Sequence, residues 1–236
     1  MGKDYAGKVL AKYELFPFHE HPYWRGVLEG RFTLPEVIRA EKQHYLRTKA
    51  GQSLRKRSVQ YAPSKSPRIF EAALGNYLEE VAPDASQPSH LELIRRLLMI
   101  GGATTLELAR TKPTPGNSAA MALYRDIADR GTACHLIGAG AVEYYYATLS
   151  PRIFDAYTRI YGMTEEQAET YRIHADVDVV HAERALAVLD EAVSIHGWQV
   201  IERSAADAFV ATSLHYDGML QAATGTSQYW NGEVIK

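Results

Sequence analysis

The sequence predicts a single all-α domain, and three observations support this prediction. Helix-capping sequences recur along the chain, apolar residues return at helical spacing, and no hairpin dipeptide stands between alternating apolar runs. The chain has 236 residues, of which 46% are hydrophobic and 23% are charged, which is ordinary for one globular domain with a substantial core. We therefore expect one domain over residues 1–236, with a frayed polar tail from about residue 224.

The first half of the chain shows four helical segments. Capping boxes at Thr33-Leu-Pro-Glu36 and Ser89-His-Leu-Glu92 each open a helix. Another segment carries Phe70, Ala73 and Tyr77 as an apolar stripe at helical spacing. The expected helices run from the first box to about residue 49, over 67–80, from the second box through residue 98, and over 121–130.

The second half continues with helical signals. A helix is expected over 133–149, where Ser150-Pro151 interrupts the chain and starts a short helix over 152–161. Thr164-Glu-Glu-Gln167 is a third capping box and opens the longest periodic segment. That segment is expected to end near His196-Gly197, and a last helix is expected over about 204–221.

The long periodic segment places titratable groups where a core should be. His174, Asp178 and His181 lie within roughly 60° of one another on a helix surface, whereas Asp176 points to the far side. Burying such groups without partners costs several kcal/mol each, as an order of magnitude. Two imidazoles and one carboxylate on one face suit a divalent metal, and a hydrogen-bonded His–Asp–His network without metal is the alternative. The full predicted core stripe is Tyr171, His174, Asp178, His181, Ala185, Val188, Ala192 and Ile195.

Three other segments offer further inward-facing ligands. Glu143 shares a helix face with small and apolar residues, Glu80 ends the stripe of its helix, and His90 opens the next helix. Glu79 falls off the stripe, although the choice between Glu79 and Glu80 stays open. Six protein ligands exceed the needs of one catalytic metal but suit two metals that share a carboxylate. Ligation by nitrogen and oxygen favours iron, with manganese as the main competitor, at Glu80, His90, Glu143, His174, Asp178 and His181.

A ferritin-like arrangement is a competing assignment. Glu41-Lys-Gln-His44 and Asp178-Val-Val-His181 are two carboxylate-x-x-His pairs, as in carboxylate-bridged bundles. The chain order differs from that fold, because both lone glutamates here lie between the pairs. We therefore expect His44 and Tyr45 to line the substrate pocket or to lie in the core. Tyr146, one turn from Glu143, is our candidate for a catalytic or pocket residue.

Charge and cysteine content exclude several function classes. The net charge is -2, so we expect neither a nucleic-acid nor an anionic membrane partner, and the Arg55-Lys56-Arg57 patch is expected to be a solvated face. No apolar run approaches the roughly 20 residues that span a bilayer, which predicts a cytoplasmic protein. Cys134 is the single cysteine, and one cysteine cannot form an internal disulfide or a thiolate metal cluster. It lies about 180° from Glu143 on the same helix and should face away from the site.

These positions resemble the pattern of the haem-oxygenase-like di-iron oxidases, relatives of the thiaminase II (TenA) and pyrroloquinoline-quinone synthase (PqqC) proteins. The resemblance begins at His21-Pro-Tyr-Trp-Arg-Gly-Val-Leu-Glu-Gly30 and continues through Asn76-Tyr-Leu-Glu-Glu80 and His90. It includes Glu143 and closes with the most specific motif, His174-x3-Asp178-x2-His181. The step from Glu80 to His90 is ten positions, longer than the seven seen in some members.

The resemblance implies a seven- or eight-helix bundle with a labile centre of two Fe(II) ions, O2 as co-substrate and no haem. It implies oxidation of a small amine or amino-acid-derived substrate, with N-oxygenation expected in a biosynthetic pathway. Desaturation or C–C cleavage of an amino acid or fatty acid is the first alternative, and a cofactor-free PqqC- or TenA-like enzyme or a non-catalytic metal-binding protein is the second. We expect a homodimer, and an external electron donor is compatible with this chemistry.

Overall fold

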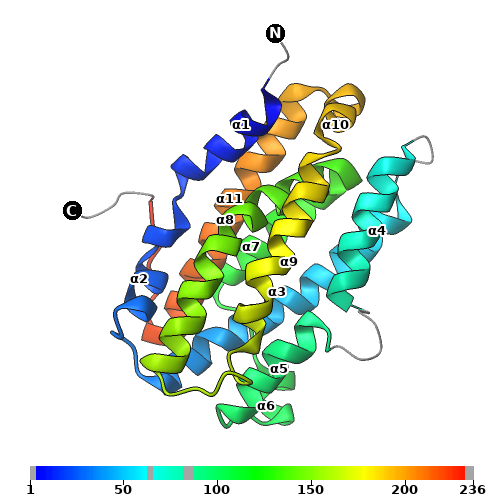
Figure 1. The fold of residues 1–236 in the computed structure, drawn as a ribbon. Coiled ribbons are helices and arrows are strands. Elements are labelled where there is room, and N and C mark those ends of the chain that lie inside the picture. Colours follow the sequence, from blue (N-terminus) through cyan, green and yellow to red (C-terminus); the bar gives the residue numbers. More distant parts are fainter. Residues whose placement is uncertain (1–3, 63–65, 82–87, 232–236) are drawn as a thin grey trace.

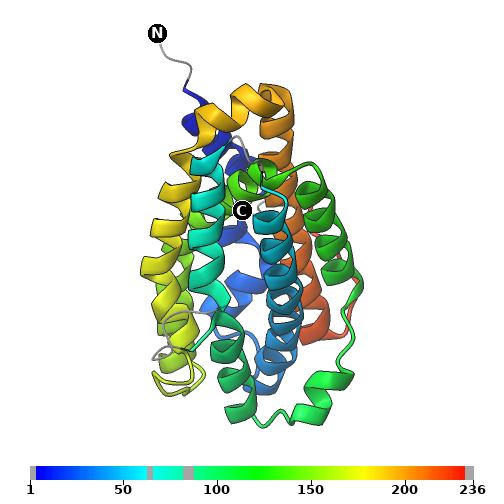
Figure 2. The ribbon, with the colours of Figure 1, turned by 90° about the vertical axis from the view of Figure 1, so that its right-hand side faces the viewer.

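The helices of the chain run roughly along one long axis, with α10 at one end of the molecule and α5 and α6 at the other (Figures 1 and 2). The computed structural model describes residues 4–62, 66–81 and 88–231. This part contains no strand, which confirms the all-α prediction. Eight of its helices have eight or more residues: α3 (Leu34–Gln60), α4 (Pro67–Val81), α5 (His90–Ile100), α7 (Pro115–Asp129), α8 (Thr132–Arg159), α9 (Glu169–Leu186), α10 (Leu189–His196) and α11 (Trp198–Thr224).

Shorter elements complete the bundle. These are the α-helices α1 (Tyr5–Leu10), α2 (Pro22–Leu28) and α6 (Thr105–Arg110), and two 3₁₀ helices. The 3₁₀ helices η1 (Ala11–Leu15) and η2 (Phe18–Glu20) lie between α1 and α2 in the chain. Helix α2 packs against α8 and α11, where Trp24, Tyr157 and Phe209 are fully buried. No described helix is both long and apolar enough to cross a membrane.

Helix α8 contradicts the expected break at Ser150-Pro151. It continues through Pro151 to Arg159 as one helix. A proline inside a helix removes one backbone hydrogen bond and tends to kink or end it. Here Leu149, Ser150 and Ile153 around the proline are all buried, so packing against neighbouring helices holds this stretch in helical form.

The long segment from Thr164 to His196 contains two helices where we expected one. The side chains of Thr164 and Gln167 make the predicted capping hydrogen bonds, but α9 begins only at Glu169. The helix then ends at Leu186, and Arg68 donates a 2.7 Å hydrogen bond to the freed carbonyl of Ala187. Val188 and Ala192 of the predicted stripe are buried as expected, whereas Ile195 near the end of α10 is 45% exposed.

Other boundaries also differ from expectation. Helix α3 runs eleven residues beyond Lys49, and α7 and α11 each begin six residues earlier than predicted. Helix α6 was not predicted, although Thr104 and Glu107 form a capping box at its start. In α4 the buried stripe passes through Ile69, Ala72, Ala73, Asn76 and Glu80, whereas Phe70 is exposed.

The described part of the tail beyond α11 contacts the bundle at Trp230. Beyond α11 the backbone N–H of Trp230 donates to the buried Asp217 at 2.9 Å. The Trp230 ring packs edge-on against His21, with 5.1 Å between the ring centroids. Residues 224–229 are exposed, so the frayed tail stays a prediction, and its remainder lies outside the described residues.

A close approach of α8 and α9 brings their polar groups together. A Cβ added at Gly140 of α8 would lie 2.4 Å from the Cβ of Ala185 and 3.5 Å from the Cα of Ala182 in α9. Only glycine fits this contact without displacing α9. The contact lies one turn before Glu143 and one turn after His181, so it sets the distance between those two side chains.

We expect Gly140→Ala to lower the free energy of unfolding by about 1–3 kcal/mol, because the new methyl group overpacks the α8–α9 contact. Gly51 in α3 is the matched control, since a Cβ there would meet nothing within 4 Å. Gly51→Ala should raise the free energy of unfolding by up to about 1 kcal/mol. Urea denaturation followed by circular dichroism measures both changes, and equal effects of the two substitutions would contradict the proposed role of Gly140.

Candidate metal centre

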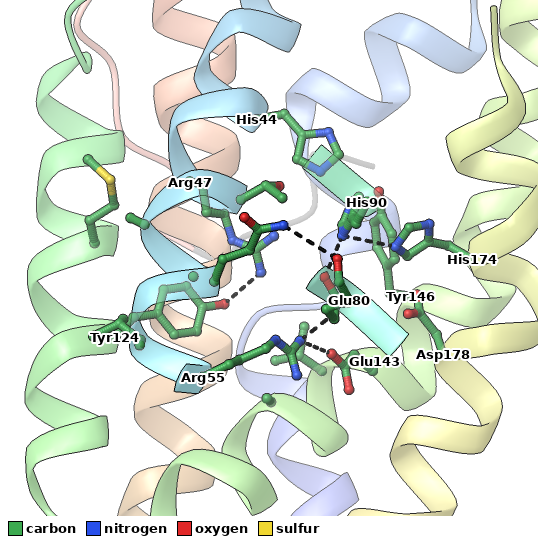
Figure 3. A pocket seen from close by; sticks show the side chains of 18 of the residues that line it. His44, Arg47, Arg55, Glu80, His90, Tyr124, Glu143, Tyr146, His174 and Asp178 are labelled. Atoms are coloured by element: carbon green, nitrogen blue, oxygen red, sulfur yellow. Dashed lines mark hydrogen bonds and ion pairs between the residues drawn. The ribbon is translucent and has the colours of Figure 1, made fainter. Parts of the chain in front are cut away.

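The structure brings all six predicted ligands, which come from four helices, to one place. Figure 3 shows five of them, Glu80, His90, Glu143, His174 and Asp178. Glu80 lies near the end of α4 and His90 is the first residue of α5, so the two helix ends meet here. Helix α8 contributes Glu143, and α9 contributes the three residues of its polar stripe. All are buried except His90, which is partly buried. Asp176 is exposed on the opposite side of α9, as its position predicted.

Two sets of three potential ligands lie side by side. Oxygen or nitrogen atoms of Glu80, His90 and His174 all lie within 4.8 Å of one another, and so do those of Glu80, Glu143 and His181. Glu80 belongs to both sets, which is the position expected for a carboxylate shared by two metal ions. Asp178 belongs to neither set but lines the same cavity.

The histidine rings are oriented by hydrogen bonds on their outer sides. His174 donates from Nδ1 to the carbonyl of Thr170 at 2.6 Å, which leaves Nε2 facing the site. His181 donates from Nε2 to Glu79 at 2.9 Å, which leaves Nδ1 facing inward. Such outer partners are typical of metal-binding histidines. The geometry therefore separates the two adjacent glutamates: Glu80 points into the site and Glu79 orients His181 from outside.

Several buried ligand atoms have no hydrogen-bond partner. Native proteins satisfy the great majority of buried polar atoms, so four orphans in one cluster require an explanation. A bound divalent ion would supply the missing partner of the Glu143, Asp178 and His181 atoms, and nitrogen and oxygen donors without sulfur fit iron or manganese. His90 instead faces Glu80 and His174 through Nδ1, so its orphaned Nε2 is not part of this argument. The role of these residues as metal ligands remains a prediction. The four atoms are Nε2 of His90, Oε2 of Glu143, Oδ2 of Asp178 and Nδ1 of His181.

Arg55 compensates the negative charge of the cluster, contrary to the expectation that Arg55-Lys56-Arg57 is a solvated face. Its Nη2 lies 2.5 Å from Glu143 and 3.7 Å from Glu80, and its side chain is only 18% exposed. Lys56 and Arg57 are exposed, as predicted. Helical periodicity could have found Arg55, because it lies eleven residues after His44 and so shares a face of α3 with it.

The carboxylates of the cluster titrate in opposite directions. Burial alone would raise the pKa of Glu143, but the Arg55 guanidinium and His181 together outweigh it and lower that pKa to about 2. Burial raises the pKa of Asp178 well above its ordinary value, and the charges of Glu143 and Glu80 raise it further. Without a metal, Asp178 is therefore the carboxyl group of the cluster that most readily holds a proton. Metal ions would have to compensate the negative charge that Asp178 gains when it loses this proton.

A cavity of about 100 Å³ opens beside the cluster and has room for several waters or a small organic molecule. His44 and Tyr146 line it and Tyr45 does not, and the identity of this cavity as the substrate pocket stays a prediction. The Tyr146 ring stands edge-on to His174 with 6.5 Å between centroids. Tyr144 is exposed, and Tyr145 instead stacks on Tyr13.

The ferritin-like alternative does not match this arrangement. Glu41 is fully buried and accepts hydrogen bonds from Tyr157 at 2.5 Å and Tyr171 at 2.6 Å. His44 Nδ1 lies 3.0 Å from its other oxygen. With its oxygens satisfied by tyrosines and histidine, Glu41 belongs to neither set of potential ligands found among the described residues. Cys134 is buried and does not line the cavity, as its position on α8 predicted.

His135 of α8 also lines the cavity, and it predicts a pH dependence of stability. Burial and the charge of Arg55 lower the pKa of His135 from 6.5 to about 4. The unfolded chain therefore binds a proton between these pH values that the folded chain does not, and stability is lost as the pH falls through this window. At about pH 5 this loss amounts to about 2 kcal/mol.

On transfer from about pH 7.5 to about pH 5, we expect the free energy of unfolding of metal-free His135→Gln to fall by about 2 kcal/mol less than that of the wild type. The other buried histidines contribute equally to both proteins, so comparison of the two losses isolates His135. Urea unfolding at each pH measures them. Identical losses in the two proteins would show that His135 is protonated without cost in the folded state.

Comparison with known proteins places this geometry in context. A family model described as an iron-containing redox enzyme matches residues 54–212. Among solved structures, a CADD-like protein of unknown function from Nostoc punctiforme PCC 73102 superposes with a TM-score of 0.74 at 13% identity, covering 94% of this chain and 99% of that one. No curated protein matched the chain.

Two further structures show the same fold. A TenA family transcription regulator from Silicibacter sp. TM1040 has a TM-score of 0.71 at 16% identity, covering 94% of this chain and 97% of the other. A domain of unknown function with a heme oxygenase-like fold from Shewanella denitrificans OS217 has a TM-score of 0.65 at 17% identity, covering 97% and 96%. These similarities confirm the haem-oxygenase-like architecture that the sequence motifs predicted.

Proposed function

This chain belongs to the family of iron-containing redox enzymes, and we propose that it is a non-haem di-iron enzyme that uses O2 to oxidise a small amine or amino-acid-derived substrate by N-oxygenation. One observation carries the proposal of two metals: two sets of three potential ligands share Glu80. The orphaned polar atoms of the cluster fit the same interpretation. Two bound ferrous ions would supply the electrons that reduce O2.

The residues of the chain would hold and orient the reactants. Glu80, His90 and His174 would hold one iron, and Glu80, Glu143 and His181 would hold the other. Asp178, whose Oδ2 has no partner, would complete the set once it loses its proton. Tyr146 stands where a substrate in the cavity would contact it, and burial raises the pKa of Tyr146 well above its ordinary value, so it would act as a neutral hydrogen-bond donor.

Desaturation or C–C cleavage would use the same ligands and is the first alternative. Cofactor-free chemistry of the TenA type is the second, since one fold neighbour carries that family name. TenA-type hydrolysis needs a nucleophilic cysteine in the pocket. Cys134 lies outside the cavity, and burial raises the pKa of its thiol, so the observations favour the iron enzyme.

Anaerobic titration with Fe(II) followed by exposure to O2 tests the proposed function. The wild type should bind two Fe(II) per chain and consume O2 in proportion to the bound iron. Asp178→Ala should lose iron affinity, whereas Asp176→Ala, on the exposed side of the same helix, should not. Equal iron binding by the two variants would contradict the assignment of Asp178 as a metal ligand. Iron binding without O2 consumption would indicate a storage site instead of an oxidase.

Mass spectrometry then separates the reaction types. The iron-loaded enzyme would be incubated with amines and amino acids in the presence of O2 and a chemical reductant. N-oxygenation adds 16 or 32 mass units to the substrate, whereas desaturation removes two. Products of the second kind would replace N-oxygenation with the first alternative.

A further inference from the structure

Arg47 is a second cation in the cavity, and among the described residues it has no carboxylate partner. It lies on α3 two turns before Arg55, and its guanidinium lines the cavity. Nη2 donates a 3.3 Å hydrogen bond to the hydroxyl of Tyr124, and the guanidinium carbon lies 5.2 Å from the centroid of that ring. Among the described residues, no carboxylate oxygen lies within 4.0 Å of Arg47, in contrast to Arg55.

Such an arginine is unusual inside a protein. A guanidinium carries five N–H donors, and a partly buried one is normally paired with a carboxylate. Stacking on Tyr124 stabilises the cation but leaves most of its donors free. The residue next to Arg47 adds a second unsatisfied group: Thr48 is buried, lines the same cavity, and its hydroxyl has no hydrogen-bond partner.

The position of Arg47 relative to the candidate metal centre is informative. Figure 3 shows Arg47 and Tyr124 on one side of the cavity, with His174 and Asp178 on the other. The lining of the cavity also includes uncharged side chains such as Met121, Val142 and Tyr146, beside the charged Arg55 and Glu80. A molecule that bridges the cavity would thus meet a cation and a hydroxyl at one end and the cluster at the other.

We propose that Arg47 and Thr48 form a subsite for the carboxylate of an organic acid, such as an amino acid, and that this subsite orients the substrate toward the candidate metal centre. The identification of the bound acid as the substrate rests on the proposed function. A guanidinium binds a carboxylate through two parallel hydrogen bonds, which fixes the orientation of the acid as well as its position. The remainder of the acid would extend along the uncharged walls.

Binding of hexanoate and its neutral analogue hexanamide tests the subsite by calorimetry. Wild-type protein should bind hexanoate at least about tenfold more tightly than hexanamide, because only the carboxylate gains charge-assisted hydrogen bonds. Arg47→Gln should abolish this preference and Arg47→Lys should retain part of it. Arg125→Gln, which removes an exposed arginine next to Tyr124 in the chain, should leave the preference unchanged.

Two more variants keep the result interpretable. Thr48→Val, which replaces the hydroxyl with a methyl group of similar size, should weaken hexanoate binding severalfold and leave hexanamide binding unchanged. His174→Ala should retain the preference, because the subsite does not need iron. Loss of the preference in His174→Ala would place the carboxylate on the metal instead and overturn the subsite while supporting the metal centre. Equal affinity of the wild type for hexanoate and hexanamide would also overturn the subsite. Inorganic phosphate that binds at the site as tightly as hexanoate would overturn it as well.

Discussion

Glu80→Gln is expected to weaken the binding of both metal ions by more than about 100-fold, because loss of a shared ligand exceeds the 10–100-fold effect of losing an outer partner. Glu80 is the one side chain that belongs to both sets of potential ligands. A glutamine of the same shape keeps the packing of α4 but offers only one neutral oxygen. Titration with Mn(II), followed by electron paramagnetic resonance of the free ion, would measure both affinities.

Glu79→Gln is the matched control, one residue away on the same helix. Glu79 is 43% exposed and reaches only the outer nitrogen of His181, where Arg184 also holds it. Loss of Glu79 should lower the affinity about tenfold for only one of the two ions, the one that His181 helps to bind. Weaker binding in Glu79→Gln than in Glu80→Gln would reverse the inner and outer roles assigned to the two residues.

Arg55→Gln is expected to destabilise the metal-free protein by about 3 kcal/mol, because two buried carboxylates lose their compensating charge. The metal-bound protein should lose much less, since the ions supply positive charge at the same carboxylates. By linkage, saturating Mn(II) should therefore stabilise Arg55→Gln more than it stabilises the wild type. Urea unfolding with a chelator and with excess Mn(II) measures the two differences.

Arg57→Gln is the control for this experiment. Arg57 lies two residues further along α3, is exposed, and pairs with Asp129 at the surface. Its replacement should change stability by less than about 1 kcal/mol, with or without Mn(II). Equal loss of stability in metal-free and Mn(II)-bound Arg55→Gln would mean that Arg55 is a structural residue with no relation to metal binding.

The parts of the site that lie within one helix could be predicted from the sequence. His174, Asp178 and His181 form a polar stripe in an otherwise apolar pattern, and a periodic pattern fixes which side chains share a face. The same reasoning chose Glu80 over Glu79 and placed Cys134 away from the cavity. Periodicity places Arg55 on the same face of α3 as His44, but it could not assign the roles of Arg55 and Arg47, because those roles depend on which helices pack against α3.

Helix boundaries were harder to predict for a related reason. Proline tends to end a helix because of its local chemistry, but the buried residues around Pro151 override that tendency in α8. At the break between α9 and α10, Arg68, which is distant in sequence, satisfies the carbonyl of Ala187. In both places tertiary contacts outweigh local signals, and a single sequence does not display those contacts.

Anomalous X-ray scattering at the iron edge, from crystals loaded anaerobically with Fe(II), is the most direct measurement of the candidate centre. Two iron peaks are expected, one on each side of the Glu80 carboxylate. One should lie against His90 and His174, and the other against Glu143 and His181. A single peak, or iron bound away from Glu80, would contradict a two-iron centre with a shared carboxylate.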